Sequence, residues 1–303
     1  MRWSNSALYT LQQCGERFRR RYIERDFRPT GVRAKRGTAV HKVASESHMR
    51  QMRSKEAGAG REEYLVGSLP TVEEAKDLAA TVFDAAMVEG CAFSEDERAE
   101  GVEKVTGVQK DASVQMAEHY VGIIAPKVDP VGVERRVTIR PADSDIEITG
   151  IVDLVSEEWA GESPQEMTDS PLALERRVRG QKIEVVNDLK TADRQPQEDA
   201  ASRSQQLALY ALIRTAEMGR PPDKVRLRTL VRTRTGKTSS VEQTAEKTQP
   251  DLEAVAQRLN TAIRAAEAQI FVPANPESWY CHPKWCEFFS DCPYALGKER
   301  PTT

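Results

Sequence analysis

The chain contains 303 residues, of which 39% are hydrophobic and 30% charged, and this composition supports a large buried core in one or two domains. The formal net charge of −3 excludes a global positive field that would draw the protein to nucleic acid. No apolar run approaches the length of a membrane span, and no signal-peptide core follows the first residues. We therefore expect a cytoplasmic protein with no membrane partner, in which five cysteines favour metal binding over disulfides.

The first predicted helix, from about residue 6 to residue 25, is strongly basic. Ten Lys or Arg residues stand against three acids between Cys14 and Lys42, and aromatic residues are interleaved with them. Such a segment can follow a phosphate backbone, although the same charges are also typical of a solvated helix face. The residues of this helix that we expect to contact phosphate are Arg17, Arg19, Arg20 and Arg21.

The next segment is predicted to be helical and offers little for chemistry. A second helix is expected to begin after Gly37, which places His41 in its first turns. A histidine in such a position is usually structural. Residues 45–125 are interpreted as a helical insertion, in which Cys91 has no neighbouring cysteine and serves as buried filler.

Predicted strands then place acids in apolar surroundings. Residues 133–139 and 146–155 are expected to be strands, and Asp153 lies within the second of them. A buried carboxylate needs a cation or strong hydrogen bonds to remain charged. After a polar connection, the strand 183–191 points Asp188 and Lys190 to the same face. This pair can hold a divalent cation and act on water, and the alternative is an ordinary ion pair.

A helix, a strand and another helix follow. The helix from about residue 198 to residue 218 places Gln206 and Tyr210 on one face, four residues apart. The strand 225–231 is unusually basic, and we expect Arg226 and Arg228 to contact phosphate. The last helix, from about residue 252 to residue 270, leads into a cysteine-rich tail.

The tail segment, residues 279–295, contains three cysteines within twelve residues: Cys281, Cys286 and Cys292. Clustered thiolates suit an iron–sulfur cluster or zinc, and Cys14 is the candidate for the fourth ligand. The Cys-Pro dipeptide at residues 292–293 and the surrounding aromatic residues favour the iron–sulfur cluster. Structural zinc remains the alternative, with His282 available as a substitute ligand.

Taken in order, these motifs resemble the RecB-like branch of the PD-(D/E)XK nuclease superfamily in its iron–sulfur-bearing form. Relatives of this kind include nuclease domains of AddAB-type helicase–nucleases, CRISPR-associated RecB-like exonucleases and phage recombination exonucleases. The resemblance covers about residues 4–294 and rests on Cys14, Gly-x-x-x-His at 37–41, Glu134, Gly-x-x-Asp at 150–153, Asp-x-Lys-Thr at 188–191, Gln-x-x-x-Tyr at 206–210 and the tail cysteines. The chain departs from many relatives in having four residues between Cys281 and Cys286, where they have two.

The resemblance implies a role for each motif residue. Asp153, Asp188 and the backbone carbonyl of Leu189 would ligate Mg²⁺ or Mn²⁺, and His41 would be a further ligand that favours Mn²⁺. Lys190 would orient the attacking water. Gln206 and Tyr210 would position Lys190 and the scissile strand, and Glu134 would be a weaker candidate for an acid at the metal site. Cys14, Cys281, Cys286 and Cys292 would together hold one [4Fe–4S] cluster.

The implied protein is a metal-dependent DNA exonuclease acting in recombination, repair or phage DNA processing. We expect one α/β domain over residues 1–303, with a mixed central sheet flanked by helices, because a shared cluster would join the two ends of the chain. No Walker motif is present, so partners beyond DNA ends would be a single-strand annealing protein or a separate helicase. Two alternatives stay open: a non-catalytic DNA-binding or assembly subunit with the nuclease fold, and a zinc-stabilised enzyme of different chemistry.

Overall fold

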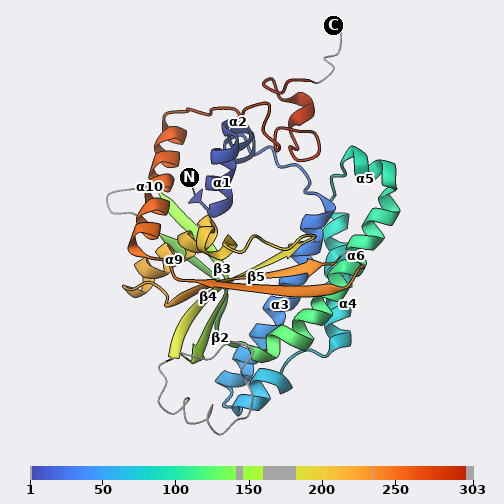
Figure 1. The fold of residues 1–303 in the computed structure, drawn as a ribbon, viewed down its shortest axis with the longest axis vertical. Coiled ribbons are helices and arrows are strands. Elements are labelled where there is room, and N and C mark those ends of the chain that lie inside the picture. The colour runs from blue at the N-terminus through green and yellow to red at the C-terminus, as the bar shows by residue number, and fades with distance from the viewer. Residues whose placement is uncertain (1, 141–145, 160–181, 234, 298–303) are drawn as a thin grey trace.

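A mixed six-stranded sheet forms the centre of the protein, as seen in a computed structural model that describes residues 2–140, 146–159, 182–233 and 235–297 (Figure 1). The strand order is β1-β3-β4-β5-β6, and β2 pairs with the other edge of β3. Strands β4 and β5 are parallel, as are β1 and β3, whereas the remaining pairs are antiparallel. The strands are β1 (Arg2–Trp3), β2 (Asp129–Ile139), β3 (Glu147–Trp159), β4 (Lys182–Ala192), β5 (Lys224–Arg232) and β6 (Thr238–Ala245).

Helices cover both faces of the sheet (Figure 1). On one face pack α1 (Asn5–Gln13), α9 (Gln205–Met218) and α10 (Gln249–Glu267), through a core that includes Leu8, Leu209, Ile213 and Leu259. On the other face lie α3 (Val32–Glu56) and α6 (Val102–His119), whose Val40 and Met116 meet apolar residues of the sheet. The expected fold class, a mixed sheet flanked by helices, is confirmed.

The predicted helical insertion forms a lobe beside α3. This lobe consists of a π-helical turn (Glu63–Gly67), α4 (Val72–Val88), α5 (Glu95–Glu100) and α6, followed by a second π-helical turn (Tyr120–Ile124) and a 3-10 turn (Ala125–Lys127). Small residues such as Ala75 and Ala79 let α4 pack closely against α3 and α6. Helix α3 continues without a break through residue 45, the expected start of the insertion, because the same helix covers the sheet and supports the lobe.

The first predicted helix is interrupted at Cys14. Helix α1 ends at Gln13, Cys14 is extended with φ −158° and ψ 113°, and the chain then forms α2 (Gly15–Phe18) and a π-helical turn (Arg19–Ile23). The Cys14 sulfur caps α2 by accepting a hydrogen bond from the Arg17 backbone at 3.4 Å. A similar interruption divides the helix predicted from residue 198 into α8 (Ala200–Arg203) and α9, because the Ser204 hydroxyl caps the start of α9.

After α10, residues 268–297 form the C-terminal tail, which consists of turns and one 3-10 turn (Phe289–Asp291). The tail returns to the N-terminal helices, so the two ends of the described chain lie side by side (Figure 1). The polar connection expected between β3 and β4 lies mostly in residues 160–181, outside the described residues. Among those that are described, no helix combines the length and apolar character needed to cross a membrane.

Candidate active site

The two predicted acids lie on neighbouring strands at the centre of the sheet. Asp153 is on β3 and Asp188 on β4, next to the register pair Leu154–Asn187. The Asp188 side chain is 1% exposed and that of Asp153 is 23% exposed. The backbone N–H of Leu189 donates to Asp153 Oδ2 at 3.0 Å, which fixes this carboxylate against β4. The antiparallel pairing therefore brings together two acids that are 35 positions apart in the sequence.

Asp188 is joined to Lys190, Gln206 and Tyr210 by a chain of hydrogen bonds. Lys190 Nζ donates to Asp188 Oδ1 and to Gln206 Oε1, both at 3.0 Å. Gln206 Nε2 donates to Asp188 Oδ1 at 2.9 Å and to the Tyr210 hydroxyl at 2.7 Å. Helix α9 thus holds the Lys190 ammonium in one position, while that side chain remains 45% exposed.

The close packing of α9 on β3 depends on a residue of the Gly-x-x-Asp motif. A Cβ atom at Gly150 would lie 2.8 Å from Ile213 Cδ1 and 3.4 Å from the ring of Tyr210. A larger residue would force the Ile213 side chain to shift and would crowd the Tyr210 ring. The motif therefore combines an acid with the close approach that brings Tyr210 and Gln206 to it.

Burial opposes ionisation of both acids. Desolvation raises the pKa of Asp188 to about 6, and the neighbouring charge of Asp153 adds to this effect, while Lys190 opposes it. Desolvation also raises the pKa of Asp153, again against the effects of the Leu189 N–H and Lys190. Two adjacent carboxylates with raised pKa values are a typical feature of a site that binds a cation or performs acid–base chemistry.

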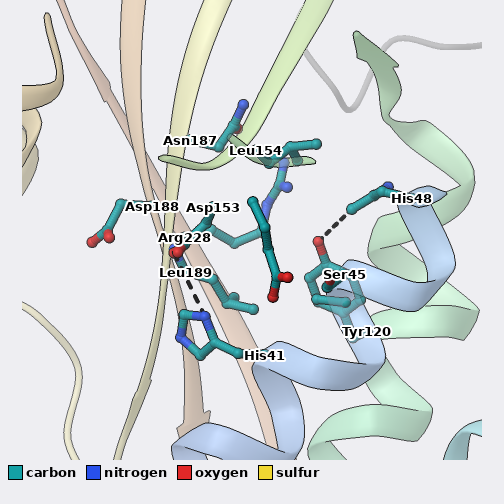
Figure 2. Close-up of a pocket in the computed structure, with 12 residues that line it drawn as sticks. His41, Ser45, His48, Tyr120, Asp153, Leu154, Asn187, Asp188, Leu189 and Arg228 are labelled. Carbon is teal, nitrogen blue, oxygen red and sulfur yellow. Dashed lines mark hydrogen bonds and ion pairs between the residues drawn. The ribbon is translucent and has the colours of Figure 1, made fainter. Parts of the chain in front are cut away.

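His41 extends from α3 toward the same acids. Its Nδ1 atom lies 3.6 Å from Asp153 Oδ2, as the dashed line in Figure 2 shows. Burial, together with the positive charge of Lys190, lowers the pKa of His41, while a hydrogen bond with the Leu189 backbone opposes this shift. The imidazole is therefore neutral at neutral pH, which is the form that can ligate a metal ion.

Glu134 lies opposite Asp153 on the paired strand β2. Its backbone has φ +45°, a left-handed conformation that is uncommon for a residue with a side chain. Glu134, His41, Asp153, Asp188 and Leu189 line one small cavity of about 20 Å³. The charge of Glu134 contributes to raising the pKa of Asp153 and opposes the lowering of that of His41.

A buried polar network that the sequence analysis missed forms the back of this cavity. His48 Nε2 is hydrogen-bonded to the Tyr120 hydroxyl at 2.6 Å (Figure 2). His48 Nδ1 is hydrogen-bonded to Gln51 Oε1 at 2.7 Å. His48 is fully buried, which lowers its pKa to about 4 and keeps it neutral. The available signal was its position two helical turns after His41, which puts both side chains on the same face of α3.

Arg226 and Arg228 do not occupy the surface position predicted for phosphate contacts. Both are 3% exposed. Arg226 pairs with Glu158, and Arg228 Nε pairs with Glu242 Oε1 at 2.8 Å. The predicted phosphate contacts of these two residues are therefore wrong: both faces of β5 are covered, and each guanidinium is neutralised within the protein.

The arginines after Cys14 pair with acids, mostly in the C-terminal tail. Arg17 and Arg21 contact Glu287 at 2.8 and 3.2 Å, and Arg20 contacts Asp291 at 2.6 Å. Arg19 instead pairs with acids of its own segment, Glu16 and Glu24. Three of these four arginines thus hold the tail against the N-terminal helices.

Electrostatic effects connect the cysteines of the predicted cluster. Burial raises the pKa of Cys281, and Cys14 and Cys292 add to this shift. Burial likewise raises the pKa of Cys286 to about 11, with a further contribution from Cys14. The Cys14 sulfur accepts hydrogen bonds from the Arg17 and Ala274 backbones at 3.4 and 3.3 Å. Cys91 packs against residues of the helical lobe.

Neither the acids of the candidate active site nor the four cysteines form a complete metal-binding site. Within residues 2–140, 146–159, 182–233 and 235–297, no three His, Cys, Asp or Glu side chains are placed to hold a metal ion. The residues nevertheless fit one between the acids, because Asp188 Oδ2 is buried and accepts no hydrogen bond, although Lys190 Nζ lies 2.9 Å away. A cation would satisfy this oxygen and offset the electrostatic repulsion between the two carboxylates.

The chain matches the family model of the PD-(D/E)XK nuclease superfamily over residues 2–165 and 175–294, and it therefore belongs to that superfamily. The fold and the paired acids agree with this assignment. A solved crystal structure of SSO0001 is similar over 84% of this chain and 85% of its own, with 14% identity and a TM-score of 0.32. No curated protein matches the chain. Membership of this superfamily indicates a metal-dependent nuclease that acts on DNA.

Proposed function

We propose that this protein is a metal-dependent DNA exonuclease of the RecB-like, iron–sulfur-bearing branch, acting in recombination, repair or phage DNA processing. The observation that carries the proposal is the pair of adjacent carboxylates, Asp153 and Asp188, beside the hydrogen-bonded Lys190, with Asp188 Oδ2 buried, ion-paired to that lysine and accepting no hydrogen bond. The Asp188 carboxylate also holds Lys190 and Gln206 in position. It is suited to a cation that arrives with, or just before, a nucleic-acid substrate.

The proposed metal ligands are Asp153, Asp188, His41 and the backbone carbonyl of Leu189, with Glu134 as a further acid at the same cavity. A divalent cation held there would supply a Lewis acid that acidifies water and neutralises charge on the scissile phosphate. Neutral His41 adds a nitrogen donor to oxygen donors, and this favours Mn²⁺ over the harder Mg²⁺.

The protein residues position the reacting groups. Lys190 is held by Asp188 and Gln206 but remains half-exposed, so its ammonium can orient a water molecule and stabilise negative charge on a phosphate oxygen. Gln206 accepts from Lys190 and donates to Tyr210, so its orientation fixes that of the lysine. Tyr210 remains protonated, because burial raises its pKa further above neutrality.

We also propose that Cys14, Cys281, Cys286 and Cys292 hold a [4Fe–4S] cluster that joins the two ends of the chain. Their mutual electrostatic effects and the backbone N–H groups aimed at Cys14 support this arrangement, since such hydrogen bonds are common at cluster sulfurs. The cluster would be structural. Redox chemistry is not needed for hydrolysis of a phosphodiester.

The test is digestion of end-labelled single- and double-stranded DNA with Mg²⁺, with Mn²⁺ and with chelator. We expect cleavage from ends that depends on the metal ion and that Lys190→Ala reduces by at least about a hundredfold, the usual scale for loss of a group that stabilises transition-state charge. Lys182→Ala is the matched control, because Lys182 begins the same strand and pairs with Glu157 away from the site. Undiminished cleavage by Lys190→Ala would exclude this site as the catalytic centre.

A further inference from the structure

Two large aromatic side chains of the C-terminal tail are exposed and touch each other. Trp279 is 64% exposed and Trp285 is 48% exposed. Their ring centroids lie 5.9 Å apart at an interplanar angle of 81°, and the ammonium of Lys284 lies 5.6 Å from the centroid of Trp285. Indoles of this size are normally buried, and exposed clusters of them mark binding surfaces.

Two cavities, an outer one beside Trp285 and an inner one beside Gln206, border some of the same residues. The outer cavity has a volume of about 270 Å³ and is lined by Trp285, Arg17 and Arg21. The inner cavity has a volume of about 560 Å³, shares Arg17, Arg21 and Thr30 with the outer one, and reaches Gln206. Gln206 bonds both Lys190 and Asp188, so the inner cavity borders one residue of the catalytic hydrogen-bond network.

The charge around these two cavities favours a polyanion. The lining of the outer cavity contains four cationic residues, Arg17, Arg21, Arg33 and Lys284, against Glu97 and Glu287. Among the described residues, the lining of the inner cavity contains Arg17 and Arg21 and no carboxylate. Ion pairs offset part of this charge, because Arg33 contacts Glu97 and Asp193 and Lys284 contacts Asp96. Glu287 serves both Arg17 and Arg21, so these two arginines keep a surplus of one positive charge. Here the chain differs locally from its overall charge of −3.

We propose that Trp279 and Trp285 form a platform on which unpaired bases of a single-stranded DNA end stack before the backbone enters the outer cavity. The proposal rests on the nuclease function above and specifies how its substrate is recognised. Stacking on exposed aromatic rings does not depend on base identity, and paired bases inside a duplex do not present their faces. Arg17 and Arg21 would then contact the following phosphates, as predicted from the sequence for these two residues.

The experiment measures binding rather than cleavage. Wild-type protein without added divalent metal is titrated against a fluorescent oligothymidine of about 20 nucleotides, the site size of a few binding modules. An abasic strand of equal length and a duplex closed by hairpins at both ends are the comparison probes. We expect Trp279→Ala to weaken oligothymidine binding about 5- to 100-fold, which is the range for loss of one base–aromatic stack. Binding of the abasic strand should be unchanged.

A second indole–lysine pair provides the control. Trp159 lies at the end of β3 with Lys182 Nζ 5.8 Å from its ring centroid, so Trp159→Ala removes a similar pair elsewhere on the protein. Trp159→Ala should bind oligothymidine as wild type does, and Trp279→Phe should retain most of the affinity because it keeps an aromatic face.

The possible outcomes test the stacking platform and the proposed nuclease function independently. Equal loss of affinity for the abasic strand in Trp279→Ala, or no loss for either strand, would overturn the platform. Stacking-dependent binding by a protein that cleaves no DNA with Mg²⁺ or Mn²⁺ would overturn the proposed function and leave the platform in place. Tighter binding of the closed duplex than of oligothymidine would also overturn the platform.

Discussion

Asp188 carries the largest electrostatic cost in the site. Its pKa is raised to about 6, so a folded chain holds a proton here at pH values where the unfolded chain has lost it. The contribution of this group to the unfolding free energy is therefore fully present below about pH 4, where an ordinary aspartate is protonated. That contribution is lost as the pH rises through 6. With chelator present, Asp188→Asn should raise the unfolding free energy above pH 6 by about 1–3 kcal/mol and have little effect near pH 4.

Thermal unfolding across this pH range measures the effect. Added Mn²⁺ should make the wild type more stable than Asp188→Asn, because the metal stabilises only the protein that can bind it. A wild-type protein that is the more stable of the two at pH 8 in chelator would show that Lys190 fully offsets the burial of the carboxylate.

Glu134 stores backbone strain next to the acids. Glycine adopts a φ of +45° without steric strain, whereas a residue with a Cβ atom is strained there by about 1–2 kcal/mol. Glu134→Gly should therefore raise the melting temperature in chelator while lowering nuclease activity. Glu134→Gln removes the charge and keeps the strain, so it should lower activity with a smaller gain in stability. Loss of stability in Glu134→Gly, measured by calorimetry, would mean that the carboxylate has a structural partner.

At the scale of elements, the contact between α2 and the tail depends on Gly15. A Cβ atom at this position would lie 2.4–2.6 Å from the backbone of Phe271 and Val272, and the Gly15 N–H donates to the Val272 carbonyl at 2.7 Å. Because backbone atoms cannot move aside cheaply, Gly15→Ala should cost about 1–3 kcal/mol and release the tail. Limited trypsin digestion should then cut after Lys284 faster than in wild type.

Gly107 provides the control for this substitution. It lies within α6, and a methyl group added there would meet no atom of another element within 4 Å, so Gly107→Ala should stabilise the protein by about 0.5–1 kcal/mol. Unchanged trypsin sensitivity in Gly15→Ala would show that the tail does not need this close approach.

At the scale of the whole molecule, an ion-pair network joins the two ends of the chain, and the proposed cluster would join them as well. Arg20 and Arg28 both contact Asp291, and they hold the pKa of this carboxyl well below its usual range. Anaerobically purified protein should be brown and contain about four iron and four sulfide per chain. Cys14→Ser should lose the colour and loosen the tail, and the residual attachment should weaken as salt screens the ion pairs.

Cys91→Ser should keep the colour, because Cys91 lies in the helical lobe. Iron analysis, visible absorbance and tail proteolysis at low and high salt measure these effects. If the protein is colourless, fully folded and contains one zinc ion, the cysteines hold structural zinc and not an iron–sulfur cluster. Loss of colour in Cys91→Ser, with Cys14→Ser unaffected, would identify a different fourth ligand.

Local pattern was enough to predict much of this protein. The apolar alternation around Asp153 and Asp188 predicted strands β3 and β4, and the period of α9 placed Gln206 and Tyr210 on one face. These inferences hold because side-chain direction in a strand or helix depends on backbone geometry alone. The order of short motifs then indicated the superfamily.

The tertiary structure decided whatever depends on neighbours from distant parts of the sequence. The sequence shows that Arg226 and Arg228 are basic, but only the packing of β3 and β6 around β4 and β5 shows that Glu158 and Glu242 neutralise them. Arg17 and Arg21 are also basic in the sequence, and only the folded chain shows that they share a single carboxylate, Glu287 of the tail. The charge of a residue is encoded locally, but its partner and its access to solvent are set by the folded chain, because burial and pairing are properties of the whole packing arrangement.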